Sequence, residues 1–250
     1  MPTVVMTHGA FCGGWAFEVF RAPFEARGWT VLAPDLPGHE PGGSVAGLSM
    51  SDYAKSLVTL CADLPEPPVL LGHSMGGLVS QMAARRVNPS ALVLLAPSPP
   101  WGITGSSIEE AVTAFGVHLS DPFWTGALTP DRHLMRHHSL DRTPKVLRDA
   151  ILDRLRPESG RAVREVLNWW LDPFMTTSVG VGALPMPALA IAGDRDVVHP
   201  AATVRQTAER IGAQFHVMPG MSHWLIGEEG WEEVAEIALS WLESHVKVEA

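Results

Sequence analysis

Short runs rich in apolar and β-branched residues, separated by helical patterns, are the feature that most constrains the fold of this 250-residue chain. Such runs are typical of strands that are buried on both faces of a parallel sheet. They occur at residues 4–6, 30–32, 69–71, 92–95, 188–192 and 215–218. Helical patterns lie between them, near residues 16–27, 51–63, 75–87 and 201–211. This alternation predicts an α/β fold with a doubly wound, mostly parallel sheet.

The segment from residue 98 to residue 183 breaks the alternation, because it contains several helix starts and no strand run. Two kinds of signal mark the helix starts: a threonine before a proline at the first helical position, and a capping box. They lie at Thr129-Pro130, at Thr143-Pro144, and at Ser107 with Glu110. We therefore expect residues 98–183 to form an α-helical cap inserted into a core made of residues 1–97 and 184–250. A last amphipathic helix begins near Trp231.

Charge and hydropathy narrow the class of partner. The net charge is −9 with no basic run, which argues against nucleic acid or an anionic membrane surface as a partner. No apolar run approaches the roughly 20 residues that span a bilayer. The first ten residues carry no positively charged segment, so the sequence predicts no secretory signal and a cytoplasmic protein. The same charge balance favours small neutral or apolar ligands, and the 46% of hydrophobic residues predicts a compact globular core.

Neither the cysteines nor the histidines outside the motifs below indicate a metal or a cofactor. Cys12 and Cys61 show no CxxC spacing, and we expect both to be reduced, packed thiols. His133 and His137 have the i, i+4 spacing of a zinc pair, with His138 beside them, but HExxH and a third ligand are absent. We interpret the three as solvent-facing residues and expect no cofactor.

A G-x-S-x-G motif follows the strand run at residues 69–71 and leads directly into the helix expected at 75–87. In this strand-turn-helix context, the turn forces the serine into a strained conformation above the sheet edge. Gly72 and Gly76 are required because a side chain at either position would collide with neighbouring backbone. The sequence therefore indicates Ser74 as a nucleophile. The alternative is a serine whose hydroxyl caps the following helix.

A serine hydroxyl needs a base within hydrogen-bond reach and a carboxylate that orients this base. His223 lies in a loop just after the last expected strand, and Asp196 lies just after the preceding strand. The order Ser74, Asp196, His223 is the one that serine hydrolases with a nucleophile elbow use. We therefore predict these three residues as the catalytic triad.

Asp194 is a competing carboxylate, because alternation in an extended segment points it in a similar direction to Asp196. We favour Asp196, since the longer loop after Gly193 gives it more reach, and Asp194 can cap the local turn. A third location for the acid, after the strand run at 92–95, is occupied by Pro97 and Ser98 and is therefore excluded.

Acyl transfer also needs N–H donors for a tetrahedral oxyanion. The backbone N–H of Met75, directly after the nucleophile, and that of Ala10, in the glycine-rich loop after the first strand, are the predicted donors. Phe11, Trp124 and Trp224 are the aromatic side chains that we expect to contact substrate.

The motifs HGAFCGGW, DLPGH, GHSMGG, GDRD and GMSHW together resemble the α/β-hydrolase superfamily, and they span nearly the whole core. The first loop is most similar to the subgroup of plant methylesterases and hydroxynitrile lyases, although Phe11 and Cys12 replace its usual Cys-His pair. The lyases carry a threonine at the position of Gly9 and a lysine at that of Trp224, so the resemblance favours hydrolysis. Relatives with an aspartate nucleophile, the dehalogenases and epoxide hydrolases, are disfavoured by Ser74.

These observations predict a serine hydrolase that cleaves a carboxylic ester or lactone of a small, largely apolar substrate through an acyl-enzyme. Two classes of alternative stay open. One is a relative that uses the same triad as a thioesterase, acyl transferase, or C–C or hydroxynitrile lyase. The other is a ligand-binding protein that retains the fold without catalysis, because fold alone does not dictate function.

Overall fold

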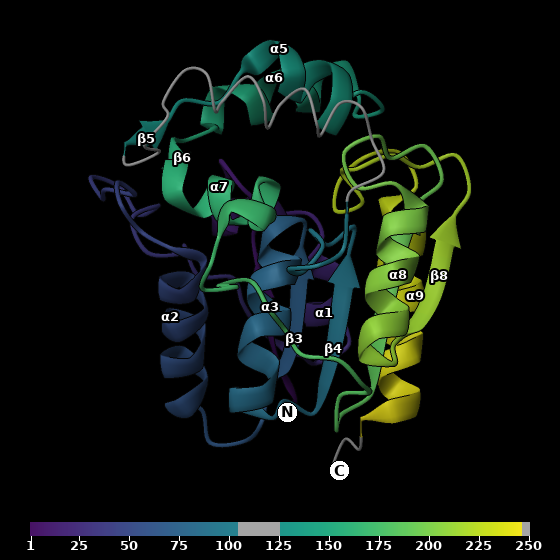
Figure 1. Ribbon diagram of the computed structural model, residues 1–250. Coiled ribbons are helices and arrows are strands. Elements are labelled where there is room, and N and C mark those ends of the chain that lie inside the picture. Colours follow the sequence, from purple (N-terminus) through teal and green to yellow (C-terminus); the bar gives the residue numbers. More distant parts are fainter. Residues whose placement is uncertain (105–125, 247–250) are drawn as a thin grey trace.

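The computed structural model of the chain describes residues 1–104 and 126–246. Its centre is a six-stranded sheet with the order β2-β1-β3-β4-β7-β8, in which every neighbouring pair is parallel (Figure 1). The strands are β1 (Thr3–Thr7), β2 (Thr30–Leu32), β3 (Val69–His73), β4 (Ala91–Leu95), β7 (Ala188–Gly193) and β8 (Gln214–Met218). Each predicted strand run falls within one of them, so the predicted doubly wound parallel sheet is confirmed.

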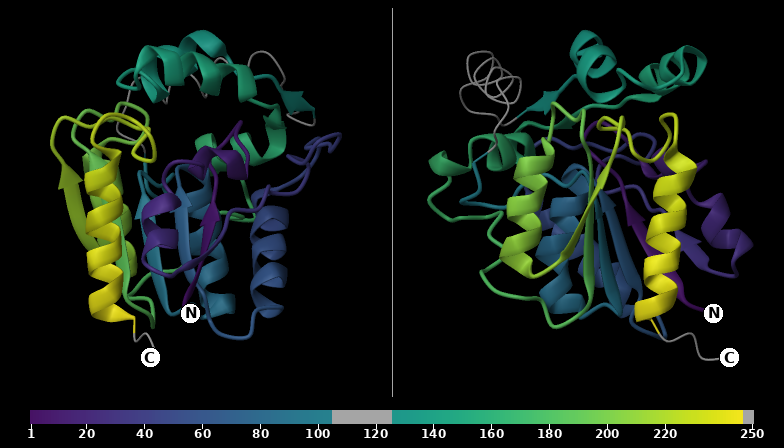
Figure 2. Two further views of the ribbon diagram at one scale, coloured as in Figure 1. Left: turned by 180° about the vertical axis from the view of Figure 1, so that it is seen from behind. Right: turned by 90° about the vertical axis from the view of Figure 1, so that its right-hand side faces the viewer.

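Helices cover both faces of this sheet (Figure 2). On one face lie α2 (Met50–Ala62), α3 (Met75–Val87) and α8 (Ala201–Ile211); on the other lie α1 (Ala22–Ala26) and α9 (Trp231–His245). Side chains alternate between the two faces along β1, since Val4 and Met6 pack in the cluster that contains α1 and α9, whereas Val5 packs with α2 and α3. Two apolar layers therefore enclose the sheet and hold its strand ends in place.

Two of the four predicted helices, α3 and α8, have the expected bounds, and α2 begins one residue earlier, at Met50. The helix expected at 16–27 is wrong in extent. It is divided into a 3₁₀ turn, η1 (Gly14–Phe17), and the short helix α1. Pro23 explains the break: it has no N–H to continue a preceding helix, but it is tolerated in the first turn of a new one.

Short elements between β4 and β7 lie above the carboxyl ends of the sheet strands (Figure 1). They are β5 (Ala127–Leu128), α5 (Arg132–Leu134), η2 (Met135–Ser139), α6 (Lys145–Arg154), β6 (Glu158–Ser159), α7 (Gly160–Leu167) and η3 (Trp169–Leu171). The expectation that this segment contains no strand is wrong, because β5 and β6 pair in antiparallel fashion. Each has only two residues, which is too short for a periodic pattern to reveal.

Both predicted threonine N-caps are also wrong. The N-cap of α5 is Asp131, whose carboxylate accepts hydrogen bonds from the N–H groups of His133 and Leu134. At α6 the N-cap position is taken by Pro144, which is extended rather than helical, so Thr143 lies one residue too early to cap. The expected capping box of Ser107 and Glu110 lies outside the described residues. Within residues 1–104 and 126–246, no helix is long and apolar enough to cross a bilayer.

Candidate active site

Ser74 lies in a strained turn between β3 and α3, with φ 54° and ψ −125°. This turn is possible because both neighbouring glycines lack a side chain. A Cβ at Gly72 would strike the carbonyl oxygen of Gly76, and a Cβ at Gly76 would strike those of Thr7 and His8. The Ser74 side chain makes no capping hydrogen bond to α3, so the helix-cap alternative is wrong. The strain lifts the hydroxyl above the sheet edge.

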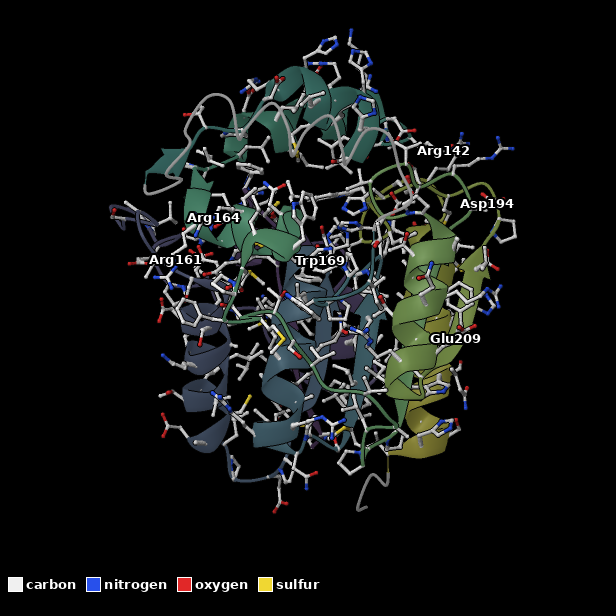
Figure 3. The ribbon with its side chains drawn as sticks, viewed as in Figure 1. Arg142, Arg161, Arg164, Trp169, Asp194 and Glu209 are labelled. Carbon is white, nitrogen blue, oxygen red and sulfur yellow. The ribbon has the colours of Figure 1, made fainter. Side chains whose placement is uncertain are left out.

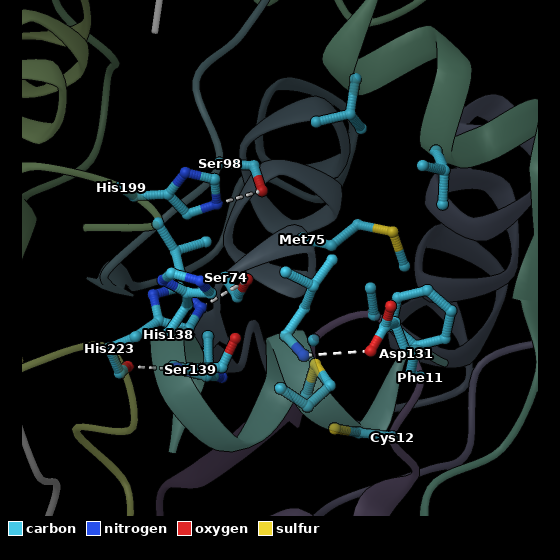
Figure 4. Close-up of a pocket in the computed structure, with 18 of the residues that line it drawn as sticks. Phe11, Cys12, Ser74, Met75, Ser98, Asp131, His138, Ser139, His199 and His223 are labelled. Carbon is cyan, nitrogen blue, oxygen red and sulfur yellow. Dashed lines mark hydrogen bonds between the residues drawn. The ribbon is translucent and has the colours of Figure 1, made fainter. Parts of the chain in front are cut away.

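Three side chains from three loops form one hydrogen-bonded chain at the carboxyl edge of the sheet. Ser74 Oγ lies 3.0 Å from His223 Nε2 (Figure 4). His223 Nδ1 lies 2.9 Å from Asp196 Oδ2. All three residues are buried. With a proton on Nδ1, the imidazole donates to the carboxylate and accepts from the serine hydroxyl. The structure thus brings together the three residues that the sequence predicts as a triad.

The second oxygen of Asp196 is also held, because its Oδ1 accepts the backbone N–H groups of Val198 at 2.8 Å and His199 at 2.9 Å. Burial raises the pKa of this carboxyl, but the neighbouring His223 and the hydrogen bonds outweigh burial, so the pKa lies below its ordinary value. Asp194, the competing acid, accepts the N–H of Gly220 at 2.7 Å and points to the outside of the molecule (Figure 3). Its carboxylate caps the local turn instead of contacting His223.

Two buried histidines that the sequence analysis did not single out support this site. His73 donates its Nε2 proton to the backbone carbonyl of His223 at 2.9 Å. His8 accepts the N–H of Leu36 on Nε2 and donates its Nδ1 proton to the carbonyl of Gly9, both at 2.9 Å. Burial lowers the pKa of His73 to about 3 and that of His8 to about 4, so both rings are neutral. Their position directly before Ser74 and Gly9 in the motifs is the signal that could have revealed them.

A cavity of about 530 Å³ opens above Ser74. Its floor includes Gly9, Ala10, Phe11, Met75 and Trp224 from the core. Its roof is formed by apolar side chains that precede β7: Leu128, Leu134, Met135, Val163, Val166 and Leu167. The predicted contacts Phe11 and Trp224 therefore line the cavity, whereas Trp124 lies outside the described residues. The space suits a small, mostly apolar ligand.

The cavity wall also contains polar residues, two of which form a hydrogen-bonded pair. Ser98 Oγ lies 2.9 Å from His199 Nε2, and both residues are buried and line the cavity (Figure 4). Burial, together with the nearby His223, lowers the pKa of His199 to about 3, so this ring is neutral and too weak a base to activate Ser98. The sequence analysis considered Ser98 only as a position that lacks an acid.

The histidine cluster in the roof is partly mispredicted. His133 and His137 are exposed, as expected, but His138 is half-buried and lines the cavity. Among the residues that the structure describes, no group of three or more His, Cys, Asp or Glu side chains is arranged to hold a metal ion. Cys12 and Cys61 are free, buried thiols, and burial raises the pKa of both.

Comparison with protein-family models matches residues 4–237 to the Alpha/beta hydrolase family. The chain belongs to this family. A pyrethroid hydrolase of Sphingobium wenxiniae is similar to this alpha/beta hydrolase, with 37% identity over 30% of this chain and 27% of that protein. The match therefore spans about a quarter of the relative's length. A monoacylglycerol lipase of Mycolicibacterium smegmatis is 27% identical over 97% of this chain and 88% of that protein.

The fold of this alpha/beta hydrolase is also found among solved structures. A methylesterase from Arabidopsis superimposes with a TM-score of 0.69 over 97% of this chain and 100% of that chain, at 20% identity. At this level of identity the likeness shows the shared fold alone. The family resemblance inferred from the five sequence motifs is confirmed.

Proposed function

We propose that this alpha/beta hydrolase is a carboxylic ester hydrolase in which Ser74 is the nucleophile, His223 the general base and acid, and Asp196 the residue that orients His223. The observation that carries the proposal is the continuous hydrogen-bonded chain from Ser74 Oγ to Asp196 Oδ2 at the floor of an apolar cavity. A nucleophile, a base and an orienting acid in this relation are the requirements of acyl transfer.

In the first half-reaction, His223 Nε2 takes the proton of Ser74 while Oγ forms a bond to the ester carbonyl carbon. The negative charge on the carbonyl oxygen is stabilised by the N–H groups of Met75 and Ala10. Met75 is suited to this role because it is the first residue of α3, where the helix provides no acceptor for its N–H. The tetrahedral intermediate then loses its alcohol, which receives the proton from His223, and an acyl-enzyme remains.

In the second half-reaction, His223 takes a proton from water, and the resulting hydroxide attacks the acyl-enzyme carbonyl. The Ser74–acyl bond breaks, Ser74 Oγ recovers the proton, and a carboxylic acid leaves. A lactone would follow the same steps and give a hydroxy acid. The neutral His73, bonded to the His223 carbonyl, holds the loop that carries the base throughout both halves.

The substrate that suits the cavity is a small, largely apolar ester. Phe11 and Trp224 provide contacts in the floor, and residues of the proposed cap, among them Leu134 and Val163, shape the roof. The names of the pyrethroid hydrolase and the monoacylglycerol lipase favour the same reaction class. Gly9 gives no hydroxyl beside Ser74, which favours a hydrolase over a hydroxynitrile lyase.

Active-site labelling together with ester hydrolysis tests the proposal. Wild-type protein should form one covalent adduct with a fluorophosphonate and should hydrolyse p-nitrophenyl acetate. Ser74→Ala should form no adduct, and its kcat should fall by a factor on the order of 10⁴ or more. Equal hydrolysis by wild type and Ser74→Ala would overturn the proposal, and a folded wild type that forms no adduct would identify a binding protein instead.

A further inference from the structure

Ala10 lies between two peptide groups that are each held by a buried polar side chain. On the preceding peptide, the carbonyl of Gly9 accepts the Nδ1 proton of His8 at 2.9 Å. On the following peptide, the N–H of Phe11 donates to Glu158 Oε2 at 3.3 Å. Because the N–H of Ala10 points opposite to the Gly9 carbonyl, these two bonds together determine the direction of that N–H.

Glu158 comes from the roof side of the molecule, at the start of β6, and its carboxylate is fully buried. Each of its two oxygens accepts two hydrogen bonds. Oε2 accepts from His39 Nε2 at 3.0 Å and from the Phe11 N–H, while Oε1 accepts from Tyr53 Oη at 2.6 Å and from the Ser159 N–H at 2.7 Å. The carboxylate therefore joins four separate donors, three of which come from the core.

The same segment also holds the other side of Phe11, because the N–H of Arg156 donates to the Phe11 carbonyl at 2.9 Å. Phe11 has φ 64°, which is uncommon for a residue other than glycine. Such a conformation persists only where the surroundings hold it, and here they do so at both backbone groups. Residues 156 and 158 thus fix the strained residue that follows Ala10.

A buried charged pair at this position is weak evidence of a stabilising role. Burial raises the pKa of Glu158, but His39 and Tyr53 outweigh burial and bring it below its ordinary value. Burial lowers the pKa of His39, but the contact with Glu158 outweighs burial and brings that pKa above its ordinary value, which favours a charged form of the pair. Buried ion pairs often stabilise a fold no more than apolar residues of the same size would.

We propose that Glu158 is a positioning residue that orients the oxyanion hole, by holding the peptide between Ala10 and Phe11 from the roof of the cavity. This inference rests on the proposed ester hydrolysis and on the role of Ala10 in it. Glu158 does not line the cavity, and its hydrogen bond to the Phe11 N–H is its direct contact with the loop that carries Ala10. It follows that docking of the roof onto the core completes the catalytic site, in addition to enclosing the substrate.

Glu158→Gln tests the proposal, because an amide cannot accept hydrogen bonds on both sides. We expect kcat for p-nitrophenyl acetate to fall by about 10- to 100-fold, since a misplaced donor costs up to about 10² in rate, while KM should stay within about twofold. The kcat value is calculated per Ser74 that fluorophosphonate labels, so that inactive protein is not counted. A trifluoromethyl ketone, which forms a tetrahedral oxyanion with Ser74, should bind more weakly by a similar factor.

Tyr53→Phe is the matched control, since it removes one donor from the same carboxylate but leaves the bond to Phe11. Its kcat and its affinity for the ketone should stay within about twofold of wild type, even where its melting temperature falls as much as that of Glu158→Gln. Equal losses of kcat in the two variants, or an unchanged kcat in Glu158→Gln, would overturn the positioning role.

A second variant serves if Glu158→Gln does not fold. Replacement of Phe11 by the corresponding α-hydroxy acid exchanges its N–H for an ester oxygen and removes the one donor in question. The same fall in kcat is expected, and an unchanged kcat contradicts the proposal. Wild-type protein without Ser74-dependent hydrolysis would instead refute the proposed function, so the two failures are distinguishable.

Discussion

The floor and the roof of the cavity are held in place by different forces. In the floor, Ser74, Asp196 and His223 follow β3, β7 and β8, whose positions are fixed by the backbone hydrogen bonds of a parallel sheet between two apolar layers. The roof consists of short helices, two of which, α5 and α6, have three and ten residues. Buried carboxylates tie it to the core: Glu158 binds the Phe11 loop, and Glu165 accepts the Met50 N–H at the start of α2.

It follows that the floor determines the position of the reacting groups, whereas the roof determines which substrates fit. Main-chain bonds of the sheet place the reacting groups, so changes in the roof can leave their distances intact. The roof instead presents apolar side chains to the cavity, and each can be exchanged with effects on size and shape. Glu158 is the exception, because its bond to the Phe11 N–H links the roof to the loop that carries Ala10, the proposed oxyanion donor.

Removal of the base should give the largest effect and should leave the roof unaffected. For His223→Ala we expect a fall in kcat on the order of 10⁴ or more, because Ser74 would lose its proton acceptor. His216→Ala, on the exposed side of β8, is the matched control and should retain activity within about twofold. Steady-state hydrolysis of p-nitrophenyl acetate measures both. If kcat fell by a similar factor in His223→Ala and His216→Ala, the loss would reflect a general sensitivity of this region to substitution and would not identify His223 as the base.

The acid gives the next largest effect. Asp196→Asn should lower kcat by about 10³- to 10⁴-fold, since an amide favours the wrong imidazole tautomer. Asp194→Asn, two residues away, should stay within about threefold, because Asp194 binds the Gly220 N–H and Arg195 rather than His223. The same hydrolysis assay compares them, and a larger loss in Asp194→Asn would reverse the assignment.

The floor could be predicted from the sequence because its residues follow strands. Apolar runs identify each strand, and parallel strands bring their carboxyl ends to one edge, so Ser74, Asp196 and His223 could be expected to meet without any knowledge of distances. Ala10 and Met75 could be named for the same reason. The motif positions of His8 and His73 could have drawn attention to these residues, but the backbone groups that their rings bind could not be predicted, because those partners depend on the folded loops.

The roof could not be predicted to the same depth. Two-residue strands such as β6 have no period, and the caps of α5 and α6 depend on which of several adjacent polar residues reaches the helix N-terminus. Glu158 illustrates the limit, because its donors lie between 1 and 147 positions away in the chain. Only the folded chain brings His39 and Phe11 to the same carboxylate.

A change in the roof should alter selectivity rather than chemistry. Val163→Phe places a larger side chain in the cavity from α7, so we expect kcat/KM for p-nitrophenyl decanoate to fall by about 10- to 100-fold while that for the acetate stays within about threefold. Val146→Phe, at an exposed position of α6, is the control and should leave both unchanged. A loss with acetate equal to that with decanoate would show that α7 also positions the reacting groups.

The smallest effect on catalysis is expected where the His223 loop of the floor meets the roof. A change there should, however, have a clear effect on stability. Glu228 is buried beneath the His223 loop and accepts the Ser222 N–H at 2.7 Å, while the Ser222 hydroxyl donates to Asp141 of the roof at 2.7 Å. Burial, with a further contribution from Asp141, raises the pKa of Glu228 to about 7.

Since the folded protein holds this proton more tightly than the unfolded chain does, the contribution to stability is complete below about pH 4.5 and is lost as the pH rises through 7. In Glu228→Gln the side chain stays neutral and can still accept the Ser222 N–H. Between pH 4.5 and 8 the free energy of unfolding of wild type should therefore fall by up to about 3 kcal/mol more than that of the variant. Urea unfolding of both proteins across that range measures the difference, in which the other titrating groups cancel. If the free energy of unfolding of the two proteins changed with pH in parallel, the titrating proton would not be that of Glu228. The kcat values at pH 7 should differ by no more than about twofold, because the hydrogen bond to the His223 loop is retained.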